Sequence, residues 1–429
     1  MKKAVVVGSG AAGAVCAKEL QGTFAVTILE EGNEFRPLTA NLSLLEKLKK
    51  SGLFFDEREI RGIFPAMKIH RAGGRMILIS GKATGGTTTI STGNAMRSDR
   101  NLKVLGIDLD EEFMELANEI PVSLEHQSKW RATTRRLFAI CRDMNLDPEP
   151  TPKMGEYGSC QNCGRCVIGC PHGVKWDSRR FLGAAISRGA RLLTRRKVSR
   201  VIIDNGRAAA VVVDHAWGKK VYPADLVILA AGGLGTPLIL QKSGIACEPT
   251  LFVDPVLCLA AEVKGVNQNR ELPMPFVVQK ENFIISPYFD FLSFFFNRRW
   301  KYRAENICSL MIKLADTNTG SISPRGVQKN LTPVDIQRLE QAGEICREIF
   351  LRLGINKNSL FYGTINAGHP GGMLPLHAAL ARSFHDPRLP ENLYVADASL
   401  FPASLGNPPI LTIMAMAKRI STICKQLPI

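Results

Sequence analysis

A glycine-rich turn close to the start of the chain constrains the fold more than any other feature. Residues 4–7 form an apolar run that predicts a buried strand, Gly8-Ser-Gly10-Ala-Ala-Gly13 follows, and residues 14–20 predict a helix. Gly8 permits a tight turn, Gly10 lets the backbone approach a pyrophosphate, and Gly13 lets helix and strand pack closely. Because free N–H groups at a helix N-terminus favour phosphate oxygens, the turn predicts a dinucleotide site.

The residue after the second expected strand, residues 25–29, discriminates among dinucleotides. Glu30 stands there, about twenty residues beyond the glycines, where a carboxylate accepts hydrogen bonds from ribose hydroxyls. A carboxylate at this point disfavours a 2′-phosphate, so FAD or NAD is expected rather than NADP.

Three further segments favour FAD over NAD. Residues 81–94 form a glycine- and hydroxyl-rich loop with Gly85-Gly86-Thr87, and residues 224–237 form an apolar strand that ends in glycines. The tail contains Asp397-Ala398-Ser399 and then Gly406-Asn407-Pro408. With the first turn, these segments resemble the glucose–methanol–choline (GMC) family of FAD-dependent oxidoreductases from end to end of the chain. The chain departs from that family in being shorter than most members and in carrying a cysteine cluster that only part of the family has.

The resemblance implies an α/β fold in which a Rossmann-like FAD-binding domain is interwoven with an α+β substrate domain. The expected FAD-binding domain comprises residues 1–110, 175–250 and 386–429, and residues 251–385 form the substrate domain. Residues 111–174 form a helical segment and a cysteine-rich loop. Carried over to this chain, the family's FAD contacts fall on Gly8, Gly10, Gly13, Glu30, Gly85, Gly86, Thr87, Asn94, Val198, Asp397 and Ala398.

Val198 is included because it follows Arg195-Arg196-Lys197, where the family places a strand whose backbone meets adenine. The alternative is that Val198 is an ordinary strand residue.

Oxidation of an alcohol needs a base beside the flavin, and the chain has seven histidines. His369, in Gly368-His369-Pro-Gly-Gly, resembles the family's catalytic loop, and Asn407 matches its second catalytic position. An imidazole accepts a proton near neutrality, whereas an amide only orients a hydroxyl by hydrogen bonding. We therefore expect His369 to be the base and Asn407 the orienting group. A solvated or capping role is the alternative for His369, and His377 and His385 are weaker candidates for substrate contact.

Four cysteines follow the spacing C-x2-C-x2-C-x3-C-P, at Cys160, Cys163, Cys166 and Cys170. This is the iron–sulfur run of bacterial ferredoxins, and four soft ligands suit either an iron–sulfur cluster or zinc. A [4Fe–4S] cluster is the favoured interpretation; zinc and free thiols are the alternatives. The fourth ligand is either Cys170 or a remote cysteine such as Cys141, and the other seven cysteines are expected to be small buried side chains.

Two other segments are informative about structure. Residues 289–303 combine an aromatic run with a basic flank. The run fits a membrane contact, an apolar substrate pocket or a strand of the substrate domain, and the strand is the favoured interpretation. Residues 331–353 predict an amphipathic helix capped by Thr332 and begun by Pro333.

The formal net charge of +16 favours anionic partners, while the sequence has no nucleic-acid reader motif. No signal segment or membrane span is apparent, so a cytoplasmic location is expected, with peripheral membrane contact as an addition. The expected enzyme oxidises the CH–OH group of an alcohol or polyol with FAD, and its cluster passes electrons to an acidic carrier such as a ferredoxin. The alternatives are the reverse reductase, a non-redox or photochemical flavin enzyme, and a non-catalytic electron-transfer protein.

Overall fold

The apolar run at the N-terminus forms the centre of a parallel sheet in the computed structural model, which describes residues 1–38, 46–47, 49, 60–73, 76–215 and 218–428. β1 (Lys3–Val7) pairs with β2 (Ala25–Leu29) on one side and β12 (Leu226–Leu229) on the other. β8 (Arg191–Leu193) and β21 (Leu393–Val395) complete the order β21-β12-β1-β2-β8. Such a sheet, built from distant parts of the chain, is the Rossmann-like architecture predicted from the sequence.

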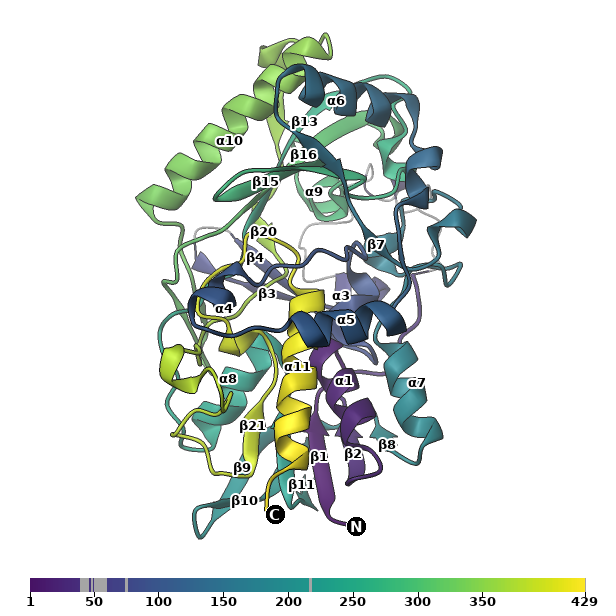
Figure 1. Cartoon of the computed structure of the whole chain (residues 1–429). Helices are drawn as coiled ribbons and strands as arrows, with labels where there is room; N and C mark the ends of the chain where they lie inside the picture. Colours follow the sequence, from purple (N-terminus) through teal and green to yellow (C-terminus); the bar gives the residue numbers. More distant parts are fainter. Residues whose placement is uncertain (39–45, 48, 50–59, 74–75, 216–217, 429) are drawn as a thin grey trace.

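Helices cover this sheet at the end of the molecule where both termini lie (Figure 1). α1 (Ala11–Leu20) packs against α7 (Arg179–Ser187) and against α11 (Ile410–Lys425), the yellow helix of the C-terminal segment. α8 (Gly232–Lys242) packs against β9 (Lys197–Asp204), which forms an antiparallel ribbon with β10 (Arg207–His215) and β11 (Gly218–Pro223).

Gly8 shows why the first turn requires glycine. Its φ is +102°, and a Cβ at this position would lie 2.3 Å from the carbonyl oxygen of Ala230, at the end of β12. The turn between β1 and α1 is therefore pressed against the neighbouring strand, and a side chain would push the two apart.

A larger sheet extends from the middle of Figure 1, where β3, β4 and β20 lie, to its top, where β13, β15 and β16 lie. Its order is β3 (Met67–Arg71), β4 (Ile77–Gly81), β20 (Asn366–Ala367), β13 (Val256–Glu262), β16 (Ile307–Leu314), β15 (Phe283–Pro287), β14 (Phe276–Gln279) and β6 (Pro148–Pro150), with β19 (Phe361–Tyr362) also paired to β13. α10 (Pro333–Arg352) packs on β15 and β16 and against α6 (Ala132–Asp143). Thr332 and Asp335 form a capping box at its start, so the predicted helix is confirmed.

The aromatic run does not form the predicted strand. It forms α9 (Phe291–Phe296), which begins where the Asp290 side chain accepts a hydrogen bond from the Leu292 N–H at 3.0 Å. Phe291, Leu292 and Phe294 are buried, so the helix is apolar on several sides. Only Asp290 and Ser293 interrupt the apolar residues of this run, so it shows neither a helical nor a strand period, which is why the sequence did not distinguish the two.

The remaining elements are short. They are α3 (Ile60–Ile63), α4 (Arg100–Val104), α5 (Asp110–Glu119), the strand pairs β5 (Val122–Ser123) with β7 (Lys153–Met154) and β17 (Ser321–Ser323) with β18 (Gly326–Gln328), and the 3-10 helices η3 (Gly86–Ile90), η4 (Glu125–Lys129), η5 (Tyr157–Ser159), η6 (Cys166–Ile168), η7 (Gln268–Arg270), η8 (Ala304–Asn306), η9 (Lys357–Ser359), η10 (Ala378–Leu380) and η11 (Ala398–Leu400). Within the described residues, no helix is long and apolar enough to cross a membrane.

Candidate active site

A cavity of about 290 Å³ lies at the carboxyl ends of the parallel strands, where ligands bind in open α/β sheets. Eight of the predicted cofactor residues line it: Gly8, Gly10, Glu30, Gly86, Thr87, Val198, Asp397 and Ala398. Five separate segments of the sequence thus contribute to one cavity.

The other three predicted cofactor residues lie elsewhere. Gly13 packs directly against the turn. A Cβ at this position would lie 2.0 Å from the Gly8 carbonyl oxygen, so the close packing requires glycine. Gly85, at φ +90°, precedes η3 and is packed against Arg179. Asn94 lines a second cavity, described below.

The first cavity has the features that a dinucleotide requires. No side chain caps the N-terminus of α1, so its first N–H groups remain available to phosphate oxygens. A Cβ on Gly10 would meet nothing nearer than the Cα of Gly86, at 3.9 Å, so the backbone there is open to a ligand. Arg196, Lys197 and Lys242 add positive charge to the lining. These residues fit FAD.

Two buried carboxylates shape this cavity. Glu30 accepts hydrogen bonds from the Ser9 hydroxyl at 2.6 Å and from the Gly32 N–H at 2.7 Å, and burial raises its pKa. Asp397 accepts from the Gly232 N–H at 2.8 Å and from the Ser399 N–H at 2.9 Å. Both carboxylates therefore hold backbone turns at the cavity wall.

A second cavity of about 170 Å³ adjoins the first and is mostly apolar. α9 supplies Phe291, Leu292, Phe295 and Phe296 to its wall. Three phenylalanines of the aromatic run thus take the pocket-lining role that was one of its three interpretations.

His369 lines both cavities and so stands at their junction. Its Nδ1 lies 3.5 Å from an Asp254 carboxylate oxygen, and the same oxygen forms an ion pair with Lys313. Burial and the Lys313 charge lower the pKa of His369, while Asp254 opposes the shift. The imidazole is therefore neutral at neutral pH and able to accept a proton.

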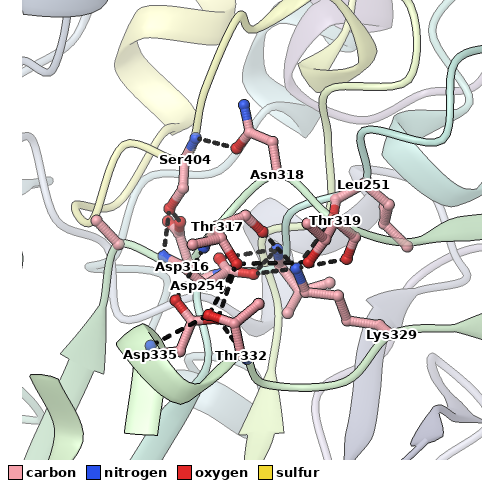
Figure 2. A network of polar contacts seen from close by, with 12 residues as sticks. Leu251, Asp254, Asp316, Thr317, Asn318, Thr319, Lys329, Thr332, Asp335 and Ser404 are labelled. Carbon is pink, nitrogen blue, oxygen red and sulfur yellow. Dashed lines mark hydrogen bonds and ion pairs between the residues drawn. The ribbon is translucent and has the colours of Figure 1, made fainter. Parts of the chain in front are cut away.

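Asp254 is held by a buried polar network (Figure 2). Its backbone N–H donates to Asp316 at 2.8 Å, and Asp316 forms an ion pair with Lys329 at 2.8 Å. The Ser404 hydroxyl donates to the other Asp254 oxygen. This network fixes the carboxylate that faces His369, in a segment where the φ of Asp254 is +53°.

Asn407 lies next to the lining of the apolar cavity rather than in it. It is half-buried and does not line either cavity, although the following Pro408 lines the apolar one. Its side-chain oxygen is buried and has no hydrogen-bond partner among the described residues. His377 is exposed and His385 bonds to the Pro390 carbonyl at 3.0 Å, and neither lines a cavity.

The four clustered cysteines line one small cavity beside η6. Cys141 is not among its lining residues and lies instead in an apolar cluster between α6 and α10. Burial raises the pKa of Cys166 to about 12 and lowers the pKa of the nearby Lys153 to about 7 and of Lys175 to about 8. In the described part of the chain, no three His, Cys, Asp or Glu side chains converge closely enough to hold a single metal ion.

Sequence reasoning missed Asp254 and Lys313. Lys313 is a lone charge in the apolar strand β16, and that break in an otherwise buried run was a usable signal. Asp254 offered no such signal. Its partners, Lys313 and His369, are 59 and 115 positions away in the sequence, and only the fold brings them near.

Comparison with known proteins agrees with this geometry. A family model described as GMC oxidoreductase matches residues 2–269. An uncharacterised protein of Methanocaldococcus jannaschii is 25% identical over 422 residues, covering 96% of this chain and 97% of its own length. An uncharacterised GMC-type oxidoreductase of Mycobacterium tuberculosis is 27% identical, covering 97% of this chain and 75% of its own.

Enzymes with named substrates are also similar. A long-chain-alcohol oxidase of Arabidopsis thaliana is 27% identical over 274 residues, or 56% of this chain and 34% of the oxidase. The fold of this chain is similar to that of pyridoxine 4-oxidase from Mesorbium loti, with a TM-score of 0.71, 15% identity, and coverage of 98% and 99% of the two chains.

Proposed function

The chain belongs to the GMC oxidoreductase family, and on this premise we propose that it is an FAD-dependent dehydrogenase of an apolar alcohol with His369 as its base. The observation that carries the proposal is the position of His369 between the dinucleotide cavity and the apolar cavity. A base at this junction is within reach of a substrate hydroxyl on one side and of the cofactor on the other.

The roles of the neighbouring residues follow from the contacts of His369. Asp254 faces Nδ1, so the proton of the neutral ring sits on Nδ1 and the lone pair of Nε2 is left for the substrate hydroxyl. FAD, which the residues of the first cavity would hold, would supply the acceptor for the carbinol hydrogen as hydride. His369 takes the hydroxyl proton, and the substrate leaves as the carbonyl compound. Asn407, beside Pro408 of the cavity wall, is proposed to orient the hydroxyl.

The substrate class is proposed from the apolar cavity and from the alcohol oxidase relatives. A wall formed largely by phenylalanine, leucine, isoleucine and methionine binds hydrocarbon better than a polyol, because it offers few hydrogen bonds. Asn366, Lys313 and His369 are among the polar groups of its lining and could hydrogen-bond a substrate hydroxyl.

Anaerobic mixing of the FAD-loaded protein with a series of alcohols tests this function. We expect long-chain and aromatic primary alcohols to bleach the flavin absorption, and glycerol and glucose to leave it unchanged. Reduction by polyols alone would overturn the apolar substrate class, and reduction by no alcohol would overturn the proposed direction in favour of the reductase. Recovery of stoichiometric NAD without flavin would overturn FAD itself.

We propose further that the cysteine cavity holds a [4Fe–4S] cluster that relays electrons to an acidic one-electron carrier such as a ferredoxin. Four cysteine side chains line one cavity, and together they supply the soft ligand set that a [4Fe–4S] cluster uses. The net charge of +16 supports an acidic partner. The cluster would supply one-electron transfer to that partner.

The division into FAD-binding and substrate domains stays a proposal with the residue ranges given above. Proteolysis of the loaded protein provides its test, because cuts at domain boundaries are expected first in exposed connections.

A further inference from the structure

Two lysines are completely enclosed in the wall between the cysteine cavity and the cofactor loop. Lys153 is 0% exposed, and its ammonium donates to the Pro273 carbonyl at 2.8 Å and to the Asn94 side chain. Lys175 is 3% exposed, and its ammonium donates to the carbonyls of Thr88, Thr89, Ser91 and Cys166 at 2.8–3.2 Å. Within the described residues, neither ammonium has a carboxylate as ion-pair partner.

Two other buried lysines behave differently. Lys313 is paired with Asp254 and Lys329 with Asp316, and all four side chains are at most 2% exposed. A buried charge without a partner of opposite sign is strongly unfavourable, so proteins pair such charges or bind an ion beside them. Lys153 and Lys175 therefore indicate that a negative charge belongs next to them.

Asp177 also attracts Lys175, but its carboxylate is already bonded to the Arg179 guanidinium at 2.8 Å. The thiols of the cysteine cavity are the other nearby groups able to carry that charge. Lys175 lines the same cavity as the four cysteines and donates to the Cys166 carbonyl at 3.2 Å. The segment of Lys153 runs beside that of Lys175, because the Trp176 N–H donates to the Met154 carbonyl at 2.9 Å and Gly155 forms a bridge with Lys175. A [4Fe–4S] core in its oxidised form carries two positive charges, and four thiolates give the complete centre a double negative charge. Two ammonium groups balance a dianion.

We propose that Lys153 and Lys175 are the paired counter-ions of a dianionic cluster held by Cys160, Cys163, Cys166 and Cys170. The inference rests on the cluster in the proposed function and adds the groups that stabilise its charge. Lys175 also joins the cluster wall to the cofactor loop, because it bonds at once to Cys166 and to the carbonyls of η3 and Ser91. The charge of the cluster and the shape of the flavin-binding loop are thereby linked through one side chain.

The test compares Lys153→Met and Lys175→Met with Lys129→Met. Lys129 donates to the Cys160 carbonyl at 2.7 Å but is only half-buried, so it controls for the loss of a lysine next to the cysteine loop. Iron and acid-labile sulfide per chain, the midpoint potential of the cluster, and the melting temperature are measured on anaerobically purified full-length protein. Each melting temperature is measured again in a Cys163→Ser background, which is expected to be free of the cluster.

We expect both buried-lysine variants to lose iron, and their remaining cluster to have a more negative midpoint potential, because the reduced centre carries more negative charge. The melting temperature should fall further in the loaded protein than in the Cys163→Ser background. Loss of the carbonyl contacts alone would lower the melting temperature equally in both. Lys129→Met should retain its iron and shift the midpoint potential less than either buried-lysine variant, because Lys129 is half-buried and solvent screens its charge. If one lysine variant does not accumulate, the other provides the same comparison.

Two contrary results are distinguishable. Wild-type protein without iron and sulfide would overturn the proposed cluster, and the lysine inference with it. Iron-loaded wild type, together with equal melting losses in both backgrounds and unchanged potentials, would overturn the role of the lysines and leave the cluster in place.

Discussion

At the scale of single residues, His369 combines the two properties of an effective base: access to both cavities and a pKa lowered by burial. We predict that His369→Ala reduces the rate of flavin reduction by alcohol by ~10²–10⁴-fold while FAD remains bound, since a positioned base contributes that much. Asn407→Ala should cost less, because it removes a hydrogen-bonding group rather than the proton acceptor. Anaerobic stopped-flow absorption measures both rates.

His385→Ala is the matched control for the His369 variant. His385 packs on the Tyr394 ring outside both cavities, with ring centroids 4.7 Å apart. An undiminished rate in His369→Ala would place the base elsewhere in the chain.

The charge beside His369 leads to a prediction about pH. The Lys313 cation disfavours imidazolium, so its removal in Lys313→Met should raise the pKa of His369. Because the neutral imidazole is the active form, the acid limb of the rate profile should move to higher pH, whereas the exposed control Lys301→Met should leave the limb in place. An acid limb unmoved by Lys313→Met would show that His369 does not control the profile.

The residues around His369 also mark the limit of sequence reasoning. His369 itself was predicted from a local motif, because Gly368-His369-Pro370 resembles a known loop. Asp254 contacts both Lys313 and His369, and these contacts arise only when the segment before β13, strand β16 and the loop after β20 come together. A sequence without its fold does not give such distances.

At the scale of elements, helix ends were more predictable than apolar runs. α10 was predicted because Thr332 and Pro333 give a local start signal, whereas α9 was not, because its phenylalanines carry no period. Both helices begin at a capping side chain, Thr332 for α10 and Asp290 for α9. In α10 a helical period follows the cap, whereas in α9 the apolar residues after the cap fit either structure, so the sequence does not decide.

The start of α10 allows a stability prediction. The Thr332 hydroxyl accepts from the Asp335 N–H at 3.3 Å, and the Asp335 carboxylate accepts from the Thr332 N–H at 2.9 Å (Figure 2). Thr332→Ala should lower the free energy of unfolding by ~1 kcal/mol, as loss of an N-cap does. Thr332→Ser keeps the cap and should lower it less; urea titration followed by circular dichroism measures both. Equal losses would assign the effect to the missing methyl group instead.

At the scale of the whole molecule, the chain returns to the parallel sheet three times after leaving it, for β8, β12 and β21. The sequence predicted this interweaving only through the family resemblance, because composition and periodicity do not order distant strands. The outcome is functional: the cofactor cavity, the apolar cavity and the cysteine cavity are each lined by segments far apart in the sequence. η3 supplies residues to the first two, and the Thr88 and Thr89 carbonyls of η3 accept from Lys175, which lines the third.

This arrangement makes the path of electrons separable from the oxidation of substrate. Cys163→Ser removes one of four proposed cluster ligands but touches neither His369 nor the apolar cavity. We predict loss of iron, from about four per chain in the wild type, and slower reduction of an external one-electron acceptor, with flavin reduction by alcohol retained. Cys141→Ser is the control, because Cys141 lies in an apolar cluster away from the cysteine cavity, and it should retain its iron.

One zinc and no iron in the wild type would contradict the cluster; unchanged acceptor reduction in an iron-free Cys163→Ser protein would contradict the relay. A purely structural cluster would instead lower the FAD content and the melting temperature of the variant together, because metal binding and folding are coupled.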